Sequence, residues 1–225
     1  MHVHTFESRH LPLLNPAASL RLLPREALVK TSRVDQADWN FRPVLGAIQR
    51  LRFRFARDLL GRERVRRLLE VGYGSGIFLP QLELHCTDLH GVDIHGKQVE
   101  VAEQLFRMGV TPRLSCASAT RLPYPDHYFD RVVAVSSLEF IDDLRRACRE
   151  IRRVLDPGGR FVIVTPSHSA VADLGLRIFT GQIAKDDFGD RRAGLVDILL
   201  ESFDIEEKRV APFLYTALRL RSPGT

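Results

Sequence analysis

Cysteine is scarce in this chain of 225 residues. The three cysteines, Cys86, Cys116 and Cys148, are odd in number, lie far apart and form no C-x-x-C pair. This pattern excludes a disulfide framework and does not indicate a zinc site, so we expect no metal centre. Reduced thiols of this kind fit a cytoplasmic protein best.

Long apolar runs are also missing. No uninterrupted apolar run approaches the roughly 20 residues that a helix needs to span a bilayer. The first residues, Met1-His2-Val3-His4, do not open a signal peptide. We therefore expect a soluble or peripheral protein.

Charge is only mildly unbalanced, with 33 Lys+Arg against 28 Asp+Glu and a net charge of +5. An excess of this size suggests at most an anionic partner or surface. It is too small to form an obvious phosphate track, so no nucleic-acid partner is expected.

The composition that is present, 44% hydrophobic, suffices to bury the core of one domain. Pro12, Pro16 and Pro24 interrupt any long helix near the start. We expect an irregular N-terminal arm over residues 1–42, lying on a single domain at 43–225. No internal repeat divides the chain further.

Residues 43–60 have helical periodicity, with a predicted apolar stripe and a strongly basic remainder. One interpretation is a helix packed on the sheet edge with a solvated arginine face. The other is weak peripheral contact with an anionic membrane, where each cation contributes about 1 kcal/mol. The predicted stripe consists of Val44, Ile48, Leu51, Phe55 and Leu59, and the basic residues are Arg50, Arg54 and Arg57.

After this helix the patterns alternate between strand and helix, which predicts a doubly wound α/β sheet. The run Val132–Val135 is apolar on both faces, as a central parallel strand requires. The chain ends in two strand-like segments, 203–210 and 213–220, that predict an antiparallel hairpin at the sheet edge. The other predicted strands are 68–71, 89–93, 113–116, 131–135 and 160–164, and the predicted helices are 78–84, 97–108 and 142–155.

A glycine-rich turn follows the first predicted strand. Glu70, Gly72, Gly74 and Gly76 form the pattern E-x-G-x-G-x-G. Glycines in such a turn allow positive φ and a close approach of the backbone to a nucleotide-like ligand. A dinucleotide fingerprint needs a glycine at position 77, where this chain has Ile77, and this argues against NAD.

Asp93 stands at the end of the second predicted strand, beside the expected place of the glycine turn. A carboxylate there can accept hydrogen bonds from both hydroxyls of a ribose. The alternative is an aspartate that caps the next helix.

Two further segments complete a recognisable order of motifs. Ala117–Val133 resembles the pattern G-D-A-x-x-L-P-F-x-x-x-x-F-D-x-V, and Glu150–Arg160 resembles E-x-x-R-V-L-K-P-G-G-R. In the second, Pro157 would end the helix and Gly158-Gly159 would reverse the chain into the next strand. With the glycine turn, these motifs cover about residues 66 to 166.

Together the motifs resemble the class I S-adenosylmethionine (SAM) dependent methyltransferases. The most similar group is the type 11 small-molecule branch, which includes quinone-biosynthesis methyltransferases. The resemblance implies a Rossmann-like, seven-stranded, mostly parallel sheet with an antiparallel C-terminal strand. It also implies SAM as the cofactor.

The resemblance assigns the cofactor site by position. The turn residues would hold the methionine part, Asp93 the ribose, and Ile94 would pack on the adenine. Ser118 and Ala119 would contact the adenine edge, where the family often has Asp in place of Ser118. The segment 136–139 would lie beside the methyl group. The implied cofactor residues are Glu70, Gly72, Tyr73, Gly74, Gly76, Asp93, Ile94, Ser118, Ala119, Ser136 and Leu138.

The implied reaction is in-line displacement of the SAM methyl group onto a small-molecule or lipid-like acceptor, for which alignment is the main requirement. Candidate bases are Glu139, His127 and His168. His168 is alternatively an exposed loop histidine. Phe140 stands where the family often has a histidine, and it cannot act as a base.

Residues 167–194 fall where the family inserts substrate covers. The apolar stretch 171–179 is either part of a lid over an apolar or amphiphilic acceptor or an ordinary crossover helix. Other functions also stay open: a non-catalytic SAM-binding or NAD-binding protein, or a nucleic-acid or protein methyltransferase. Base-amino enzymes commonly carry [DN]-P-P-[YF] after the fourth strand, where this chain has Ser136–Glu139.

Overall fold

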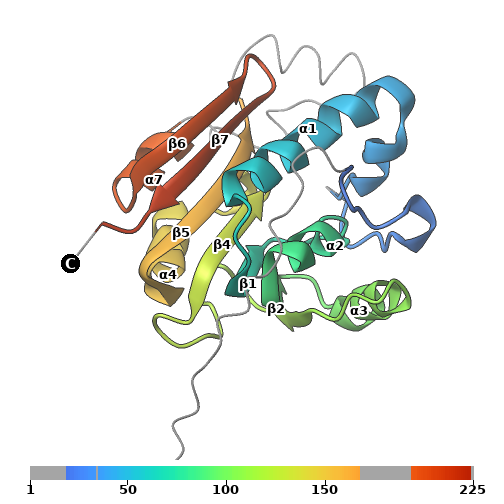
Figure 1. The fold of residues 1–225 in the computed structure, drawn as a ribbon, viewed down its shortest axis with the longest axis horizontal. Helices are drawn as coiled ribbons and strands as arrows, with labels where there is room; N and C mark the ends of the chain where they lie inside the picture. Colours follow the sequence, from blue (N-terminus) through green and yellow to red (C-terminus); the bar gives the residue numbers. More distant parts are fainter. Residues whose placement is uncertain (1–18, 34, 168–193, 224–225) are drawn as a thin grey trace, which may run out of the picture.

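A seven-stranded sheet organises the part of the chain that the structure describes (Figure 1). The computed structural model describes residues 19–33, 35–167 and 194–223. The strand order is β3-β2-β1-β4-β5-β7-β6. All strands of this sheet run in the same direction except β7, which runs in the opposite direction. The predicted α/β sheet with an antiparallel C-terminal strand is thus confirmed. The strands are β1 (Val65–Val71), β2 (Cys86–Asp93), β3 (Arg113–Cys116), β4 (Phe129–Val135), β5 (Leu155–Pro166), β6 (Asp204–Ala211) and β7 (Tyr215–Arg221).

Helices cover both faces of the sheet. On one face α1 (Pro43–Leu60), α2 (Leu79–Leu82) and α3 (Gln98–Arg107) bury their apolar side chains in a common core. On the other face lie α4 (Leu144–Val154) and α7 (Leu195–Leu200). Short 3₁₀ helices are η1 (Arg25–Ala27), η2 (Ala37–Phe41), η3 (Glu83–His85) and η4 (Leu138–Phe140).

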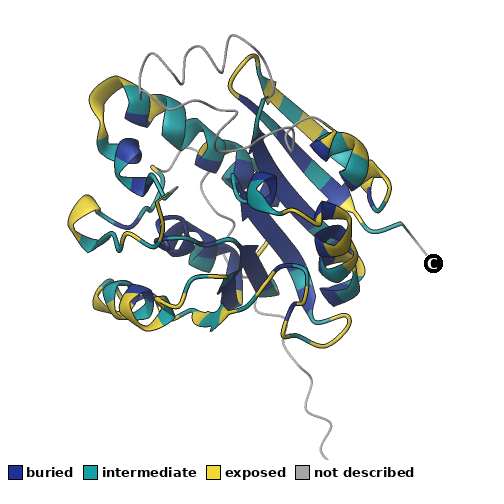
Figure 2. Cartoon of the chain, turned by 180° about the vertical axis from the view of Figure 1, so that it is seen from behind, coloured by how far each residue is buried: buried dark blue, intermediate teal, exposed yellow. Residues whose placement is uncertain are grey.

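Strand β4 occupies the centre of the sheet, as its sequence predicts. Val133 and Val135 point into the core beneath α1, whereas Val132 and Ala134 point into the core beneath α4. Strand β4 is accordingly buried at every position except Asp130, and the central strands are mostly buried (Figure 2). A strand enclosed on both faces needs apolar residues at every position, and this explains the unbroken run.

The predicted turn at Pro157-Gly158-Gly159 is wrong. Strand β5 begins directly after α4, and Leu155 already pairs with Phe129. Arg160 pairs with Arg131, so five positions of β5 span two of β4. Gly158 adopts φ 77° inside this bulge. The Pro-Gly-Gly segment therefore bends a strand instead of reversing the chain, because the bulge takes up the extra residues.

Residues 19–33 and 35–42 lie against the domain. Leu23 is fully buried in the α1 core, and its N–H donates to the Ile77 carbonyl at 3.0 Å. Helix η2 packs so closely on α1 that a side chain at Gly46 would collide with the Asn40 carbonyl, 2.4 Å from an added Cβ. Thr31, Ser32, Asp35 and Gln36 lie beside the carboxyl ends of the central strands, where they line the same cavity as Val71 and Val135.

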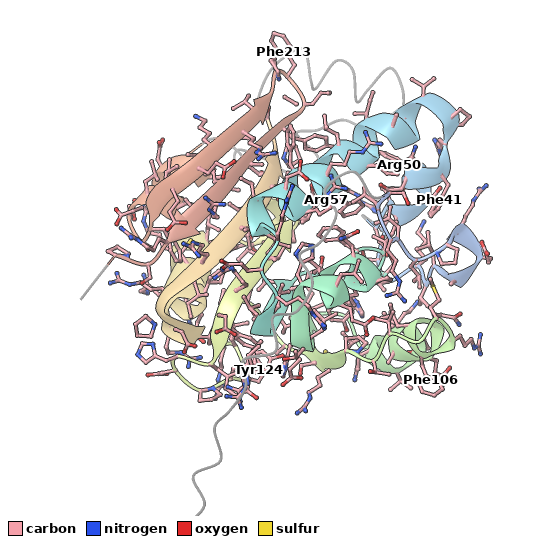
Figure 3. The ribbon with its side chains drawn as sticks, in the orientation of Figure 1. Phe41, Arg50, Arg57, Phe106, Tyr124 and Phe213 are labelled. Carbon is pink, nitrogen blue, oxygen red and sulfur yellow. The ribbon has the colours of Figure 1, made fainter. Side chains whose placement is uncertain are left out.

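The two faces of α1 differ in detail from the predicted stripe. Val44 is 70% exposed, while Phe53, Ala56, Leu59 and Leu60 form the buried face, so the predicted stripe is wrong at Val44. Nor is the arginine face wholly solvated. Arg50 donates to the Asn40 carbonyl, and Arg57 pairs with Asp58 at 2.8 Å (Figure 3).

Candidate cofactor and acceptor site

A crevice opens where β1 and β4 part. The chain first builds β2 and β3 on one side of β1 and then crosses to β4, so β1 and β4 mark the topological switch point. Their pairing ends at Glu70↔Val133, although β4 continues to pair with β5 as far as Val135. Beyond that point the Ser137 hydroxyl donates to the Val71 carbonyl at 2.7 Å. Open α/β sheets bind their ligands in such a crevice.

A cavity of about 950 Å³ occupies this crevice. It is lined by the glycine turn, the carboxyl ends of β2 and β4, the loop after β3, helix α1, residues of the ranges 31–32 and 35–39, and the tip of the β6–β7 hairpin. Small-molecule sites commonly measure about 300–1,000 Å³. The cavity thus has room for a nucleoside-sized ligand and a second small molecule.

Two glycines of the turn have distinct structural roles. Gly72 adopts φ +78°, and a Cβ there would stand 2.4 Å from the Ser137 Cβ. Gly76 adopts φ +75°, and its Cβ would stand 2.9 Å from Val101 of α3. Gly72 therefore lets the turn pass close to the β4 end and lines the cavity, whereas Gly76 permits helix packing and is not in the lining.

Asp93 faces the glycine turn. Its carboxylate accepts hydrogen bonds from the Gly74 N–H at 2.8 Å and the Ile94 N–H at 2.7 Å. The alternative role as a helix cap is wrong, because α3 has Lys97 as its N-cap residue and no side-chain cap. Asp93 also accepts a longer hydrogen bond from the His95 N–H at 3.4 Å. Because a carboxylate has about four lone-pair positions, Asp93 retains capacity for a ribose hydroxyl.

His95 also holds Gly74, through the carbonyl oxygen of that residue. The Lys97 N–H donates to Nδ1 at 3.1 Å, so the proton of the neutral ring is on Nε2 and donates to the Gly74 carbonyl at 2.9 Å. The ring also stands edge-on to Tyr73 at 5.0 Å between centroids. The N–H and the carbonyl of Gly74 are thereby fixed by Asp93, the last residue of β2, and by His95, which follows it.

The predicted adenine contacts lie at the rim of the cavity. Ile94 lines it and is 77% exposed, which leaves an apolar surface for a base to cover. Ala119 is buried in the lining. The Ser118 hydroxyl instead accepts from the Thr120 N–H at 3.2 Å and shares a hydrogen bond with the Thr120 hydroxyl at 2.8 Å. An adenine contact through Ser118 would compete with this local turn.

Several buried polar atoms of the lining have no hydrogen-bond partner within the described part of the chain. Buried polar groups in proteins are almost always paired, so a cluster of unpaired ones indicates a polar ligand. Their mixture of a cation, a carboxyl group and hydroxyls fits the amino-acid end of SAM. The atoms are Arg52 Nε, Glu70 Oε2, Tyr73 Oη, Ser75 Oγ and Ser136 Oγ.

Glu70 is the most perturbed acid of the site. It is only 3% exposed, and burial, with a smaller contribution from the charge of Asp93, raises its pKa to about 8. The opposing charge of Arg52 is the weaker influence. The carboxyl group is thus mainly neutral at pH 7, and a nearby cationic ligand would favour its ionised form.

The predicted bases divide into three cases. Glu139 is 1% exposed and lines the cavity. His127 is wrong as a base, because it precedes β4 at the opposite end of the strand and its Nδ1 donates to the Leu155 carbonyl at 3.0 Å. His168 and the predicted lid helix 171–179 lie outside the described residues.

Not every predicted cofactor residue reaches the cavity. Leu138 is buried among the side chains beneath α4 and is absent from the lining. Ser136, by contrast, lines it and adopts φ 51°, an uncommon conformation for a residue other than glycine. The segment 136–139 thus turns Ser136 and Glu139 toward the cavity and Leu138 away from it.

Sequence reasoning missed Arg52, His95 and Tyr215, which all line the cavity. For Arg52 a signal existed. The cavity-facing residues of α1 recur at i, i+3, i+4, i+7 and i+8, the spacing of one helical face. They are Leu45, Ile48, Gln49, Arg52 and Phe53. Tyr215 carried no such signal, because only the sheet order brings β7 next to β5.

Comparison with known proteins agrees with this geometry. Residues 69–163 match the protein family described as "Methyltransferase domain". The uncharacterized methyltransferase YdaC of Bacillus subtilis is 30% identical over 172 residues, which are 74% of this chain and 88% of YdaC. The chain belongs to this methyltransferase family. More particularly, its motifs and fold place it in the type 11 branch of the class I SAM-dependent methyltransferases.

Other relatives are matched over about half their length. Malonyl-[acyl-carrier protein] O-methyltransferase of Halorhodospira halophila is 33% identical over 62% of this chain and 52% of its own length. The ubiquinone/menaquinone biosynthesis C-methyltransferase UbiE of Azotobacter vinelandii is 32% identical over 58% of this chain and 54% of its own.

Among solved structures, the N-methyltransferase NodS of Bradyrhizobium japonicum in complex with S-adenosylhomocysteine has the same fold. The TM-score is 0.61 at 20% identity, over 86% of this chain and 95% of NodS. Within the ranges described above, no helix is long and apolar enough to cross a membrane. Nor do those residues include a cluster of three or more metal-ligating side chains.

Proposed function

We propose that this protein is a methyltransferase that transfers the methyl group of SAM to a small-molecule or lipid-like acceptor by in-line displacement. The observation that carries the proposal is the Asp93 carboxylate, held against the Gly74 N–H at 2.8 Å inside the switch-point cavity. A carboxylate so placed offers acceptors to a ribose while the glycine turn leaves space beside it. Among the relatives, one is named for O-methylation of malonyl-[acyl-carrier protein] and another for C-methylation in ubiquinone and menaquinone biosynthesis.

The two ends of the cofactor site would bind different parts of SAM. Asp93 and Ile94 would bind the adenosine, while Glu70, Ser136 and Arg52 would bind the amino and carboxylate groups of the methionine. SAM supplies an already electrophilic methyl group. The protein then mainly aligns the two partners and excludes water, an advantage worth about 7–11 kcal/mol. A cytoplasmic location and weak membrane contact through α1 belong to the same proposal.

Titration calorimetry tests the cofactor assignment. We expect S-adenosylhomocysteine and SAM to bind with one site each and NAD not to bind. Asp93→Asn keeps an oxygen for the Gly74 N–H but removes the charge, so it should weaken S-adenosylhomocysteine binding at least tenfold. Asp88→Asn is the matched control, because Asp88 lies on the same strand and instead contacts His90 and Arg113. Preference for NAD, or equal effects of the two variants, would contradict the assignment.

A non-catalytic SAM-binding protein remains the second candidate, since Phe140 removes a base that the family often has. Transfer of labelled methyl from SAM to the solvent-extractable molecules of a cell extract separates the two. An enzyme produces labelled extract that Asp93→Asn fails to produce, whereas a silent binder produces none.

A further inference from the structure

The end of the cavity away from the glycine turn has a composition of its own. We call it the acceptor chamber; it is enclosed by α1, η2, η4 and the β6–β7 hairpin. Its walls are mostly apolar, and two aromatic side chains of the walls are held by neighbours. The Phe53 ring stacks on Phe78 with 4.6 Å between centroids, and Arg42 Cζ lies over the Trp39 ring, 5.5 Å from its centroid. The apolar wall residues are Trp39, Leu45, Ile48, Phe53, Phe140 and Leu214.

Tyr215 is held rigidly at the edge of this chamber. It is the first residue of β7 and pairs with Pro166 at the end of β5. The preceding Leu214 carbonyl accepts from the Ser167 N–H at 2.9 Å, which fixes the hairpin tip. Figure 3 shows this tip at Phe213, with Tyr124 at the opposite end of the molecule. The Tyr215 side chain is 5% exposed and is part of the α1 core.

The Tyr215 hydroxyl has a weak partner. It donates to Gln49 Oε1 at 3.5 Å, the outer limit of a hydrogen bond. Burial raises the pKa of the phenol, so the group stays protonated and remains a donor. A ligand oxygen beside these two side chains could accept a hydrogen bond from the Tyr215 hydroxyl and, once the weak contact with Oε1 is released, a second one from the Gln49 amide Nε2–H.

The charged groups of the chamber restrict what that ligand is. Besides burial, which raises the pKa of Tyr215, Arg52 lowers that pKa and Glu139 raises it to a smaller extent. A carboxylate ligand has no proton to give to Glu139, and a plain hydrocarbon would leave the Tyr215 hydroxyl with only its weak contact to Gln49. A hydroxyl matches the set, because its proton suits Glu139 and its oxygen suits Tyr215 and Gln49.

We infer that the acceptor is an apolar, ring-containing molecule methylated on a hydroxyl oxygen, which Tyr215 and Gln49 position while Glu139 takes its proton. This inference rests on the proposed function. In the step, an oxygen electron pair forms the O–CH₃ bond as the S–CH₃ bond breaks, and that bond's pair stays on sulfur. The O–H proton passes to the Glu139 carboxylate and then to solvent. Tyr215 and Gln49 are positioning residues and exchange no proton.

Binding of four ring compounds to protein saturated with S-adenosylhomocysteine tests this inference. We expect 2-naphthol to bind at least tenfold more tightly than naphthalene, 2-naphthylamine or 2-naphthoate. Equal affinity for 2-naphthol and naphthalene overturns the inference, as does tighter binding of the amine or the carboxylate. Failure of 2-naphthol to bind at all also overturns it.

Variants separate positioning from folding. Tyr215→Phe should remove most of the preference for 2-naphthol and leave the naphthalene affinity unchanged, a result that general disruption would not give. Tyr124→Phe, at the far end of the sheet, is the matched control and should keep the preference. If the wild type fails to bind S-adenosylhomocysteine, the proposed function itself is wrong. If it binds the nucleotide but does not discriminate among the ring compounds, only the inference fails.

Discussion

In the glycine turn, Gly72 is required by a close steric contact as well as by its backbone conformation. Gly61 and Gly72 adopt nearly the same φ, +79° and +78°, but only Gly72 has a neighbour within 4 Å of an added Cβ. Comparing alanine at the two positions therefore separates the cost of positive φ from the cost of collision. The sequence motif predicts glycine at 72 but not the reason, since Ser137 is 65 residues away in the chain.

Gly61→Ala should destabilise the ligand-free protein by about 1–3 kcal/mol, the cost of a residue with a Cβ at φ 79° and ψ −170°. Gly72→Ala adds an overpacking penalty of about 1–3 kcal/mol, because the Ser137 side chain must move. Urea denaturation followed by circular dichroism measures both. Equal losses at the two positions would show that the contact with Ser137 is unimportant.

Glu70 should make stability depend on pH. Its pKa is about 8 in the folded protein and near 4.5 when unfolded, so the folded state binds more protons between these values. Stability from this group is therefore fully present below about pH 4.5 and is lost as pH rises toward 8, at about 1 kcal/mol per pH unit. Denaturation curves from pH 5 to 8.5 should show this slope in the difference between wild type and Glu70→Gln. A difference that is flat, or of opposite sign, would refute the burial of a neutral carboxyl group.

For helices and strands, the local sequence pattern predicted which elements exist, but it did not predict their local geometry or what their side chains face. The bounds of α1 and β3 agree with the predicted ranges, because Pro43 favours a helix start and a glycine, Gly61, follows the last residue of α1. The bulge at Gly158 was missed, since a Pro-Gly-Gly segment suits a turn equally well. So was the turning of Leu138 away from the cavity, which depends on the short helix η4 and not on residue type.

Helix α1, which forms one wall of the cavity, packs its buried face on β5 and β7 and on Phe78, which precedes α2. Phe53→Ala removes a ring that is stacked at 4.6 Å on Phe78 and should cost about 3–5 kcal/mol. Phe106→Ala makes the same chemical change on α3, where the ring is 71% exposed, and should change stability by no more than about 0.5 kcal/mol. Thermal unfolding of the two variants compares them directly. Similar losses would mean that α1 does not depend on this contact.

For the whole molecule, strand order matters more than any one motif. The crossover from β3 to β4 parts two neighbouring strands, and the antiparallel return of β7 brings Tyr215 to the same cavity. The family resemblance predicted a seven-stranded, mostly parallel sheet with an antiparallel C-terminal strand, but the strand order itself comes from the structure. Because both ligands would meet in one cavity, cofactor and acceptor binding should depend on the same arrangement of α1 and the hairpin.

A crystal structure of the protein soaked with S-adenosylhomocysteine tests the central claim most directly. The account predicts density for the nucleotide in the switch-point cavity, with its ribose hydroxyls within hydrogen-bond distance of Asp93 and its adenine against Ile94. The amino-acid end should point toward Glu70 and Ser136. Clear density for the nucleotide elsewhere, or a cavity that remains closed to it at saturating concentration, would contradict the account.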